Sequence, residues 1–276
     1  MILSLAYSPC PNDCFIFDAL IHKKIDTEGL DFEIHLEDVE TLNRKALKGE
    51  LDITKLSFHA YGHVISNYIL LRAGSALGFN CGPLLVQKDA FNFNDLETMK
   101  VAIPGKLTTA NFLLSLAFPK IKNKIEYVFS DIEDAVLRAE VNAGLIIHEN
   151  RFTYEQKGLK KVMDLGEFWD SHIHAPIPLG GIVIKRNRDT QLQQKVNRVI
   201  KRSVQFAFAN PESAMPYVRA HAQSMSEEVM KKHIALYVNE FSIDLAETGS
   251  KAIELLFAKA KELNLFEVKD EKIMID

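Results

Sequence analysis

The first part of the chain alternates between the hydrophobic patterns of strands and helices. Residues 2–7 form an almost continuous apolar run, which is typical of a buried strand. A proline-rich turn follows, where Asn12 or Asp13 can cap a helix over residues 15–21. In residues 30–36 apolar and charged side chains alternate, which predicts a strand with one face in the core and one in water. The chain therefore opens with a strand, a loop and a helix, and continues into a second strand.

The same pattern continues as far as residue 90. In order, we expect a helix over 39–47, a strand over 51–54, a helix over 58–64, a strand over 68–72 and a strand over 83–86. Ser57 stands where the helix over 58–64 needs its N-cap. Gly74, Gly78 and Gly82 mark a loop before the last of these strands, which we expect to end a first lobe.

A second lobe is expected in the middle of the chain. Its elements are a crossover over 88–94, a strand over 99–103, a helix from Thr109, a strand over 125–129, a helix over 132–139 and a strand over 143–148. Residues 179–184 then predict a strand that returns to the first lobe, and residues 185–189 a second crossover. The chain thus leaves the first lobe, builds a second one and comes back.

The C-terminal part of the chain is expected to be helical. Apolar residues recur there at helical spacing, namely Val196, Val199, Ile200 and Val204, and later Ile253, Leu256, Ala260 and Leu263. These helices are expected to pack on the first lobe, which comprises residues 1–90 and 186–276, with residues 91–185 as the inserted lobe. An α/β protein of two lobes, with two crossover strands and a helical C-terminal tail, has the layout of the type II periplasmic-binding-protein fold. Such a layout is expected to hinge around a ligand held in the cleft between the lobes.

Composition and charge exclude several classes of protein. Hydrophobic residues make up 47% of the 276 residues, enough to bury a sizeable core, so disorder is not a reasonable interpretation. The formal net charge of -4 comes from well-mixed charges and leaves no basic stripe for nucleic acid. No apolar run is long enough for a membrane span, and the N-terminus lacks the charged region of a signal peptide. Three cysteines form no disulfide framework and suit a reducing compartment, so we expect a cytoplasmic protein.

Two motifs have both a functional and a structural interpretation. Cys10 and Cys14 have the spacing that begins a radical iron–sulfur motif, but no third cysteine follows, and two thiols near a helix start are the favoured interpretation. His172 and His174 could point to one side of a strand, yet no further ligands complete a metal shell, so a packing or surface role is favoured. We expect no metal site and no organic cofactor.

His148 stands at the end of the apolar run over residues 143–147. In open α/β sheets, ligands collect at the carboxyl ends of strands, so this imidazole is expected at a ligand site. A histidine there can act as a general base. Its position alone favours catalysis and a hydrogen-bonded structural role equally.

Three segments share one design, each lying between a strand and a helix N-terminus. They are residues 9–13, residues 55–57 and residues 106–109. The N–H groups and the positive dipole end of a helix start favour an anion, and the hydroxyls of Ser57, Thr108 and Thr109 add donors. For any one segment taken alone, plain helix capping is the favoured interpretation. Together they predict a receptor for a small carboxylate.

An ordered set of segments resembles the 1,4-dihydroxy-6-naphthoate synthase family from end to end of the chain. The segments are Ser8-Pro9-Cys10-Pro11-Asn12-Asp13, Arg72-Ala73-Gly74-Ser75-Ala76-Leu77-Gly78, Pro104-Gly105-Lys106-Leu107-Thr108-Thr109-Ala110, Gly144-Leu145-Ile146-Ile147-His148-Glu149, Arg151-Phe152-Thr153-Tyr154 and Pro176-Ile177-Pro178-Leu179-Gly180-Gly181. The resemblance implies a lyase of menaquinone biosynthesis that acts on cyclic dehypoxanthine futalosine and releases a three-carbon fragment with the dihydroxynaphthoate. It also implies that no metal or organic cofactor takes part.

The resemblance also implies roles for particular residues. His148 matches the family's proposed general base, and the residues that match its substrate-contact segments are Lys55, Leu56, Ser57, Thr109 and Ala110. To these we add Ser8 and Asn12 from the first turn, and Thr108 from its place beside Thr109. The family usually has Asn-Asp-Thr where this chain has Asn12-Asp13-Cys14, which weakens any claim that a hydroxyl is required at position 14.

There are two alternatives, one from a different class of protein and one a sister enzyme of the same pathway. A solute-binding protein would share the fold without chemistry, although the missing signal peptide argues against it. Chorismate dehydratase, of the same pathway, shares the two-lobed fold and would act on chorismate. In each case the expected partner is a small anionic molecule, with no nucleic acid and no membrane, and a homodimer is compatible with the sequence.

Overall fold

The chain forms two compact units, which are described one at a time. The computed structural model describes residues 2–89, 93–222, 225–266 and 271–276. The first unit is Met1–Gly78 together with Pro178–Asp276, and the second is Phe79–Ile177.

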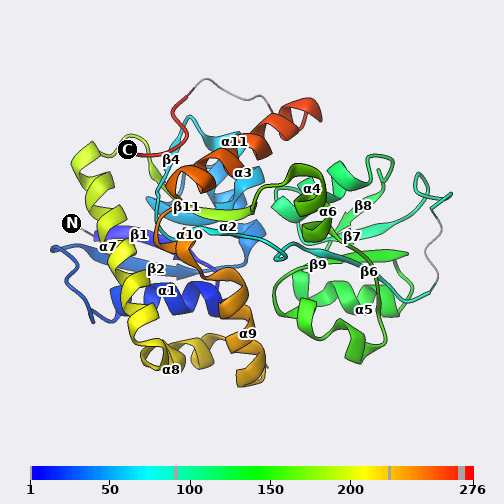
Figure 1. Ribbon diagram of the computed structural model, residues 1–276, viewed down its shortest axis with the longest axis horizontal. Helices are drawn as coiled ribbons and strands as arrows, with labels where there is room; N and C mark the ends of the chain where they lie inside the picture. Colours follow the sequence, from blue (N-terminus) through cyan, green and yellow to red (C-terminus); the bar gives the residue numbers. More distant parts are fainter. Residues whose placement is uncertain (1, 90–92, 223–224, 267–270) are drawn as a thin grey trace. The chain divides into compact units, whose positions relative to one another are not determined.

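The first unit is built on a mixed sheet. Its strands are β1 (Ile2–Tyr7), β2 (Asp31–Leu36), β3 (Ile53–Ser57), β4 (Tyr68–Leu70), β5 (Ala76–Gly78) and β11 (Ile177–Lys185). The order is β2-β1-β3-β11-β4, with β5 paired to β11 (Figure 1). β1 is parallel to β2 and β3, whereas β11 is antiparallel to β3 and β4. The returning strand predicted over 179–184 is therefore confirmed as a member of the first sheet.

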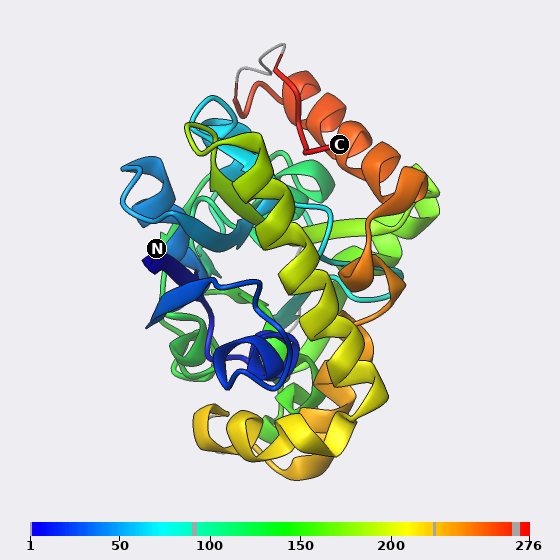
Figure 2. The same ribbon diagram turned by 90° about the vertical axis from the view of Figure 1, so that its left-hand side faces the viewer.

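Helices cover this sheet. They are α1 (Pro11–Ile21), α2 (Val39–Leu47), α3 (Phe58–Val64), α7 (Thr190–Ala209), α8 (Pro211–His221), α9 (Glu227–Tyr237), α10 (Glu240–Ile243) and α11 (Ala246–Glu262). α1 packs against α7, α8 and α9, and Figure 2 shows the long α7 running beside α1 and meeting α8. Val196, Val199, Ile200 and Val204 of α7 are buried in the core of this unit, as their helical spacing predicts.

The second unit has a sheet of its own. Its strands are β6 (Leu84–Gln87), β7 (Val101–Ile103), β8 (Lys124–Glu126), β9 (Ala143–Ile146) and β10 (Lys160–Asp164), in the order β10-β6-β9-β7-β8. Its helices are α4 (Thr109–Ala117), α5 (Ile132–Leu137) and α6 (Leu165–Ile173), with short 3-10 turns at Phe129–Asp131, His148–Phe152 and Tyr154–Lys157. β7 is parallel to β8 and β9, while β6 is antiparallel to β9 and to β10.

Some predicted boundaries were wrong. The strand at residues 84–87 does not close the first lobe, because it pairs with β9 and β10 in the second sheet. The limits predicted at residues 90 and 185 thus lie after those of the two compact units. The crossover predicted over 88–94 includes residues 90–92, which lie outside the described residues.

Helix starts and strand ends also differ from the prediction in places that matter for the site. α1 begins at Pro11 with Cys10 as its N-cap, so neither Asn12 nor Asp13 caps it. Proline is well suited to the first helical position because its φ is already helical and it lacks the N–H that would go unbonded. β3 runs on to Ser57, so residues 55–57 belong to the strand and not to a loop. β9 ends at Ile146, before His148.

Two glycines of the second unit stand where a side chain has no room. A methyl group at Gly82 would collide with the backbone of Gly166 at the start of α6. A methyl group at Gly144 of β9 would lie 2.6 Å from Ile132 Cγ2 and 2.8 Å from Val136 Cγ2, both on α5. The neighbours of Gly144 are side-chain atoms that can shift, whereas those of Gly82 are main-chain atoms of a helix start.

We therefore expect Gly144→Ala to lower the free energy of unfolding by about 1–3 kcal/mol, the usual cost of overpacking, and Gly82→Ala to lower it by more. Urea denaturation followed by tryptophan fluorescence measures this directly. The chain's one tryptophan, Trp169, is buried in α6 of the same unit and reports on it. Equal stability of Gly82→Ala and the wild type would contradict the close approach of these two backbones.

Candidate functional site

Two adjacent parallel strands bring polar residues to one edge of the first sheet. β1 ends at Tyr7 and β3 at Ser57, and since the strands are parallel neighbours, both carboxyl ends lie at the same edge. There the ammonium of Lys55 lies 2.7 Å from Oδ1 of Asp13 and 3.3 Å from the carbonyl oxygen of Gly74. Segments predicted from the sequence as separate ligand contacts thus meet in one place.

Asp13 is the centre of this group of residues. Its carboxylate accepts hydrogen bonds from Ser8 Oγ at 2.7 Å and Ser8 N at 3.3 Å, from Asn12 Nδ2 at 2.8 Å and from Lys55 Nζ. Asp13 is 2% exposed and Lys55 7%, so the pair is largely removed from water. We call Ser8, Asn12, Asp13 and Lys55 the Asp13 cluster.

Ser57 lies two residues after Lys55, which in a strand places both side chains on the same face, while Leu56 faces the other way. Ser57 does not cap α3 with its side chain. Instead its Oγ accepts a hydrogen bond of 3.2 Å from Asn43 Nδ2, and its N–H donates to Asn43 Oδ1 at 2.9 Å. With its acceptor side occupied by Asn43, the Ser57 hydroxyl can donate a hydrogen bond to a ligand.

The second unit repeats the arrangement with β7 and β9. These strands are also parallel neighbours, so the turn after β7 and His148 after β9 lie at the same edge of the second sheet. In the turn, Thr108 caps α4: its Oγ accepts from Asn111 N at 3.2 Å and donates to Gly105 O at 2.8 Å. The Thr108 hydroxyl thus donates its proton to Gly105 O and accepts from the helix, so for this residue helix capping describes the side chain better than donation to a ligand.

Thr109 and Ala110 form the first turn of α4 and are both buried. The first N–H groups of a helix have no acceptor within the helix, and they lie at the positive end of its dipole. This is the geometry that receives a carboxylate or phosphate oxygen.

A half-buried lysine, Lys124, forms hydrogen bonds that hold this turn in position. Lys124 Nζ donates to Asn111 Oδ1 at 2.9 Å and to Ser115 Oγ at 2.6 Å, and Asn111 Nδ2 in turn donates to Lys106 O at 2.8 Å. Burial, with a smaller contribution from nearby Lys122, lowers the pKa of Lys124 to about 8. The position of residues 106–109 is thus tied to β8 through α4.

His148 has an unusual backbone conformation. Its φ is +55°, in the left-handed region, and it begins the 3-10 turn directly after β9. The ring is half-buried and packs edge-on against Phe129, with ring centroids 5.0 Å apart. The strand was predicted to run through His148, but β9 ends at Ile146 and the imidazole lies against the ring of Phe129.

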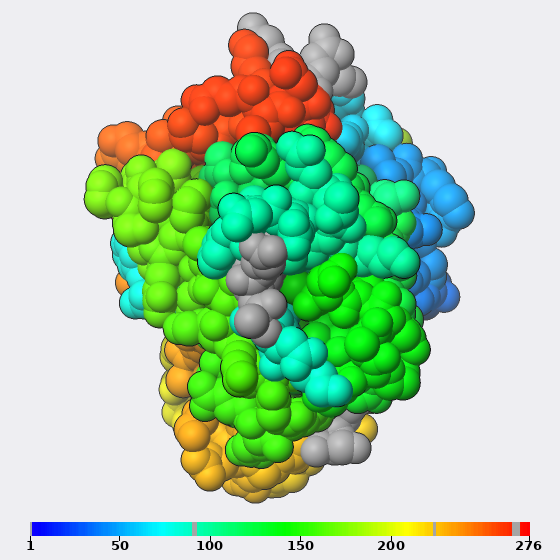
Figure 3. All heavy atoms as spheres, turned by 90° about the vertical axis from the view of Figure 1, so that its right-hand side faces the viewer, coloured from blue at the N-terminus to red at the C-terminus, as the bar shows by residue number. Residues whose placement is uncertain are grey.

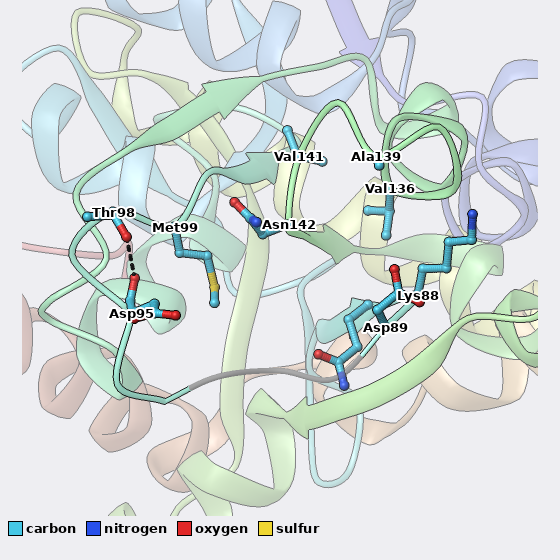
Figure 4. A pocket seen from close by; sticks show the side chains of 10 residues that line it. Lys88, Asp89, Asp95, Thr98, Met99, Val136, Ala139, Val141 and Asn142 are labelled. Carbon is cyan, nitrogen blue, oxygen red and sulfur yellow. Dashed lines mark hydrogen bonds between the residues drawn. The ribbon is translucent and has the colours of Figure 1, made fainter.

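A separate cavity of about 330 Å³ lies at the other edge of the second sheet. Its lining residues follow β6 or precede β7 and β9, as Figure 4 shows for Lys88, Met99 and Asn142. In Figure 3 the end of β6, in cyan, lies at the surface of this unit beside green atoms. Lys88, which follows β6, donates a hydrogen bond from Nζ to Leu137 O of α5 at 3.0 Å. His148 follows the opposite, carboxyl end of β9, so this cavity is not the predicted site.

The remaining motifs have structural positions. Cys10, Cys14 and Cys81 are buried free thiols, and burial raises the pKa of Cys14 well above its usual range. His172 lies in α6 and His174 is its C-cap, so they do not share a strand. Among the described residues there is no group of three or more histidine, cysteine or acidic side chains placed to hold a metal ion. Over the same residues no helix is long and apolar enough to cross a membrane.

Sequence reasoning missed three residues that shape the site: Asn43, Phe129 and His233, whose Nε2 lies 2.9 Å from Asn12 Oδ1. It named Asp13 as a possible helix cap and within the segment 9–13, but not as the acceptor of the Asp13 cluster. The sequence does draw attention to Asp13, because this charged residue ends the proline-rich turn over residues 8–13 and is followed directly by the apolar Cys14-Phe15-Ile16-Phe17. The other three come from distant segments, and nothing in the local sequence links them to their partners.

The chain is similar to known proteins over most of its length. The chain matches the model of the menaquinone biosynthesis family over residues 3–262. It is 46% identical to a 1,4-dihydroxy-6-naphthoate synthase of Thermus thermophilus, over 95% of both chains. It is 40% identical to a protein of the same name from Streptomyces coelicolor, over 94% of this chain and 92% of that one.

Solved structures define the fold. A protein of Archaeoglobus fulgidus has a TM-score of 0.91 at 36% identity and covers 96% of this chain and 98% of its own. A Candida albicans protein described as having the generic periplasmic binding protein fold has a TM-score of 0.65 at 16% identity, covering 100% and 98%. The predicted α/β, periplasmic-binding-protein-like fold is confirmed. From the family match and the two relatives together, the chain belongs to the menaquinone biosynthesis family.

Proposed function

We propose that the protein is a carbon–carbon lyase that converts cyclic dehypoxanthine futalosine to 1,4-dihydroxy-6-naphthoate with release of a three-carbon fragment. The observation that carries this proposal is the 46% identity to a synthase of that name over 95% of both chains. The placement of polar residues at the carboxyl edges of both sheets supports it, because ligands of α/β proteins bind at such edges.

His148 is the general base in this proposal. Breaking a carbon–carbon bond beside a hydroxyl requires removal of a proton while charge moves into the ring system. A half-buried imidazole at a strand end can accept that proton, and the contact with Phe129 limits the orientations of the ring. Formation of the aromatic naphthalene drives the reaction, so the protein mainly has to orient the substrate and accept the proton.

The other residues bind the substrate. Lys55 and Ser57 offer hydrogen-bond donors at one edge of the first sheet, and Ser8, whose hydroxyl proton goes to Asp13, offers an acceptor. Thr109 and Ala110 offer the N–H groups of the α4 start to an anionic oxygen. A small anionic substrate with several oxygens is consistent with this set of donors and acceptors.

The direct test is a product assay. Purified protein is incubated with cyclic dehypoxanthine futalosine, or with chorismate in a parallel reaction, and the products are identified by mass spectrometry. We expect dihydroxynaphthoate from the first substrate and no dehydration of the second. Tight binding of the futalosine compound without turnover would instead support a solute-binding protein, and dehydration of chorismate would support the sister enzyme.

His148→Ala should lower kcat by about 10²–10⁴, the usual contribution of a positioned general base, while the protein still folds and binds substrate. Steady-state kinetics and a binding measurement separate these effects. His172→Ala is a matched control, because His172 lies on the exposed side of α6 in the same unit. Turnover of His148→Ala at the wild-type rate would remove His148 from the mechanism.

Thr109→Val keeps the shape of the side chain and removes its hydroxyl. If that hydroxyl donates to the substrate, KM should rise about tenfold, as expected for the loss of one hydrogen bond, with little change in kcat. Thr98→Val serves as the control, since Thr98 lines the cavity at the other edge of the same sheet. An unchanged KM in Thr109→Val would argue against a contact there.

A further inference from the structure

A chain of three hydrogen bonds links the end of β3 to α9. Lys55 Nζ donates to Asp13 Oδ1, Asn12 Nδ2 donates to the same oxygen, and Asn12 Oδ1 lies 2.9 Å from Nε2 of His233. Because an amide oxygen can only accept, Nε2 of His233 must carry the proton. The side-chain amide of Asn12 is thereby held at both ends, by His233 at its oxygen and by Asp13 at its nitrogen.

The charged residues of the Asp13 cluster are Asp13 and Lys55, which form a buried ion pair. The neighbouring titratable groups Cys14 and Tyr7 stay neutral, because burial raises the pKa of each far above its usual range. Asp13 is therefore the negative charge that keeps a buried ammonium stable at this position.

The hydrogen bonds also set the direction of the ammonium. Within the described part of the chain, Lys55 Nζ donates to Asp13 and to Gly74 O. An ammonium has three N–H groups, so one remains for a ligand, and its direction is set by the other two.

We infer that Asp13 is a positioning residue, which holds Lys55 charged and directs its third N–H toward the substrate, and that Asn12 and His233 hold Asp13 in place. This inference rests on the proposed function, in which Lys55 contacts the substrate. It assigns a role to Asp13, which the sequence offered only as a helix cap and as part of the segment 9–13, and to His233, which the sequence did not single out.

The test compares Asp13→Asn with Asp18→Asn. Asp18 is a matched control, because it is also a buried carboxylate of α1 paired with a lysine, Lys24, at 2.6 Å. Asp13→Asn should lower kcat/KM for cyclic dehypoxanthine futalosine about a hundredfold, the effect of a misplaced contact. The pH profile of kcat/KM should also differ from that of the wild type, because the buried ammonium has lost its counter-charge. Asp18→Asn should stay within about threefold of the wild type with the same pH profile, and identical behaviour of both variants would overturn the inference.

A double variant covers the case in which Asp13→Asn does not fold. Asp13→Asn with Lys55→Gln removes both charges and leaves none buried without a partner. If Asp13 acts through Lys55, the double variant should be within about threefold of Lys55→Gln alone. A further hundredfold loss in the double variant would show that Asp13 acts independently and would overturn the inference.

Amine labelling separates this inference from the proposed function. With an amine-reactive anhydride and detection by mass spectrometry, Lys55 should be acylated about tenfold faster in Asp13→Asn than in the wild type at the same pH, since a neutral amide holds the amine less tightly than the carboxylate does. Asp18→Asn should leave the rate unchanged. Equal labelling in all three proteins would overturn the positioning role, whereas absence of turnover by the wild type would contradict only the proposed function.

Discussion

The parallel pairing of neighbouring strands is the constraint on which the candidate site depends. β1 lies beside β3 in the first sheet and β7 beside β9 in the second, and in each pair both strands point the same way. Parallel neighbours must deliver their carboxyl ends to one edge, so whatever follows them in sequence is brought together there. The Asp13 cluster and the edge that carries His148 are both consequences of this rule, reached through different loops in different units.

The buried ion pair of Asp13 and Lys55 is not explained by stability. Removing two charges from water costs several kcal/mol per ion, and the attraction between them does little more than offset that cost. What the pair does supply is a fixed orientation of the Lys55 ammonium. The Asp13 carboxylate is held by four hydrogen bonds, one of them from Lys55 Nζ, and so limits the directions in which the remaining N–H of Lys55 can point. The pair lies at the carboxyl edge of the sheet, where a defined donor would serve the proposed substrate and a hydrophobic replacement would not.

The fold by itself does not distinguish an enzyme from a carrier. Structures of low sequence identity to this chain share its architecture and include a ligand-binding component of an import system from Staphylococcus aureus, at 13% identity. Function therefore has to be argued from particular residues and from close relatives. Here the proposed function relies on a histidine, His148, whose backbone is left-handed just after a strand, and on a buried ammonium, that of Lys55, at the edge of another sheet.

The sequence by itself determined the class of fold, most of the strands and helices and the segments that carry the candidate site. Hydrophobic periodicity and strand-to-helix turns are local properties, so β1, α2, β11 and the C-terminal helices could be recognised without a structure. The tertiary structure decided which sheet β6 joins, where β9 ends, and that Asp13 has Lys55 and, through Asn12, His233 as partners. Those contacts join residues up to 221 positions apart, and local sequence carries no information about them because they arise only when the sheet and the helices pack.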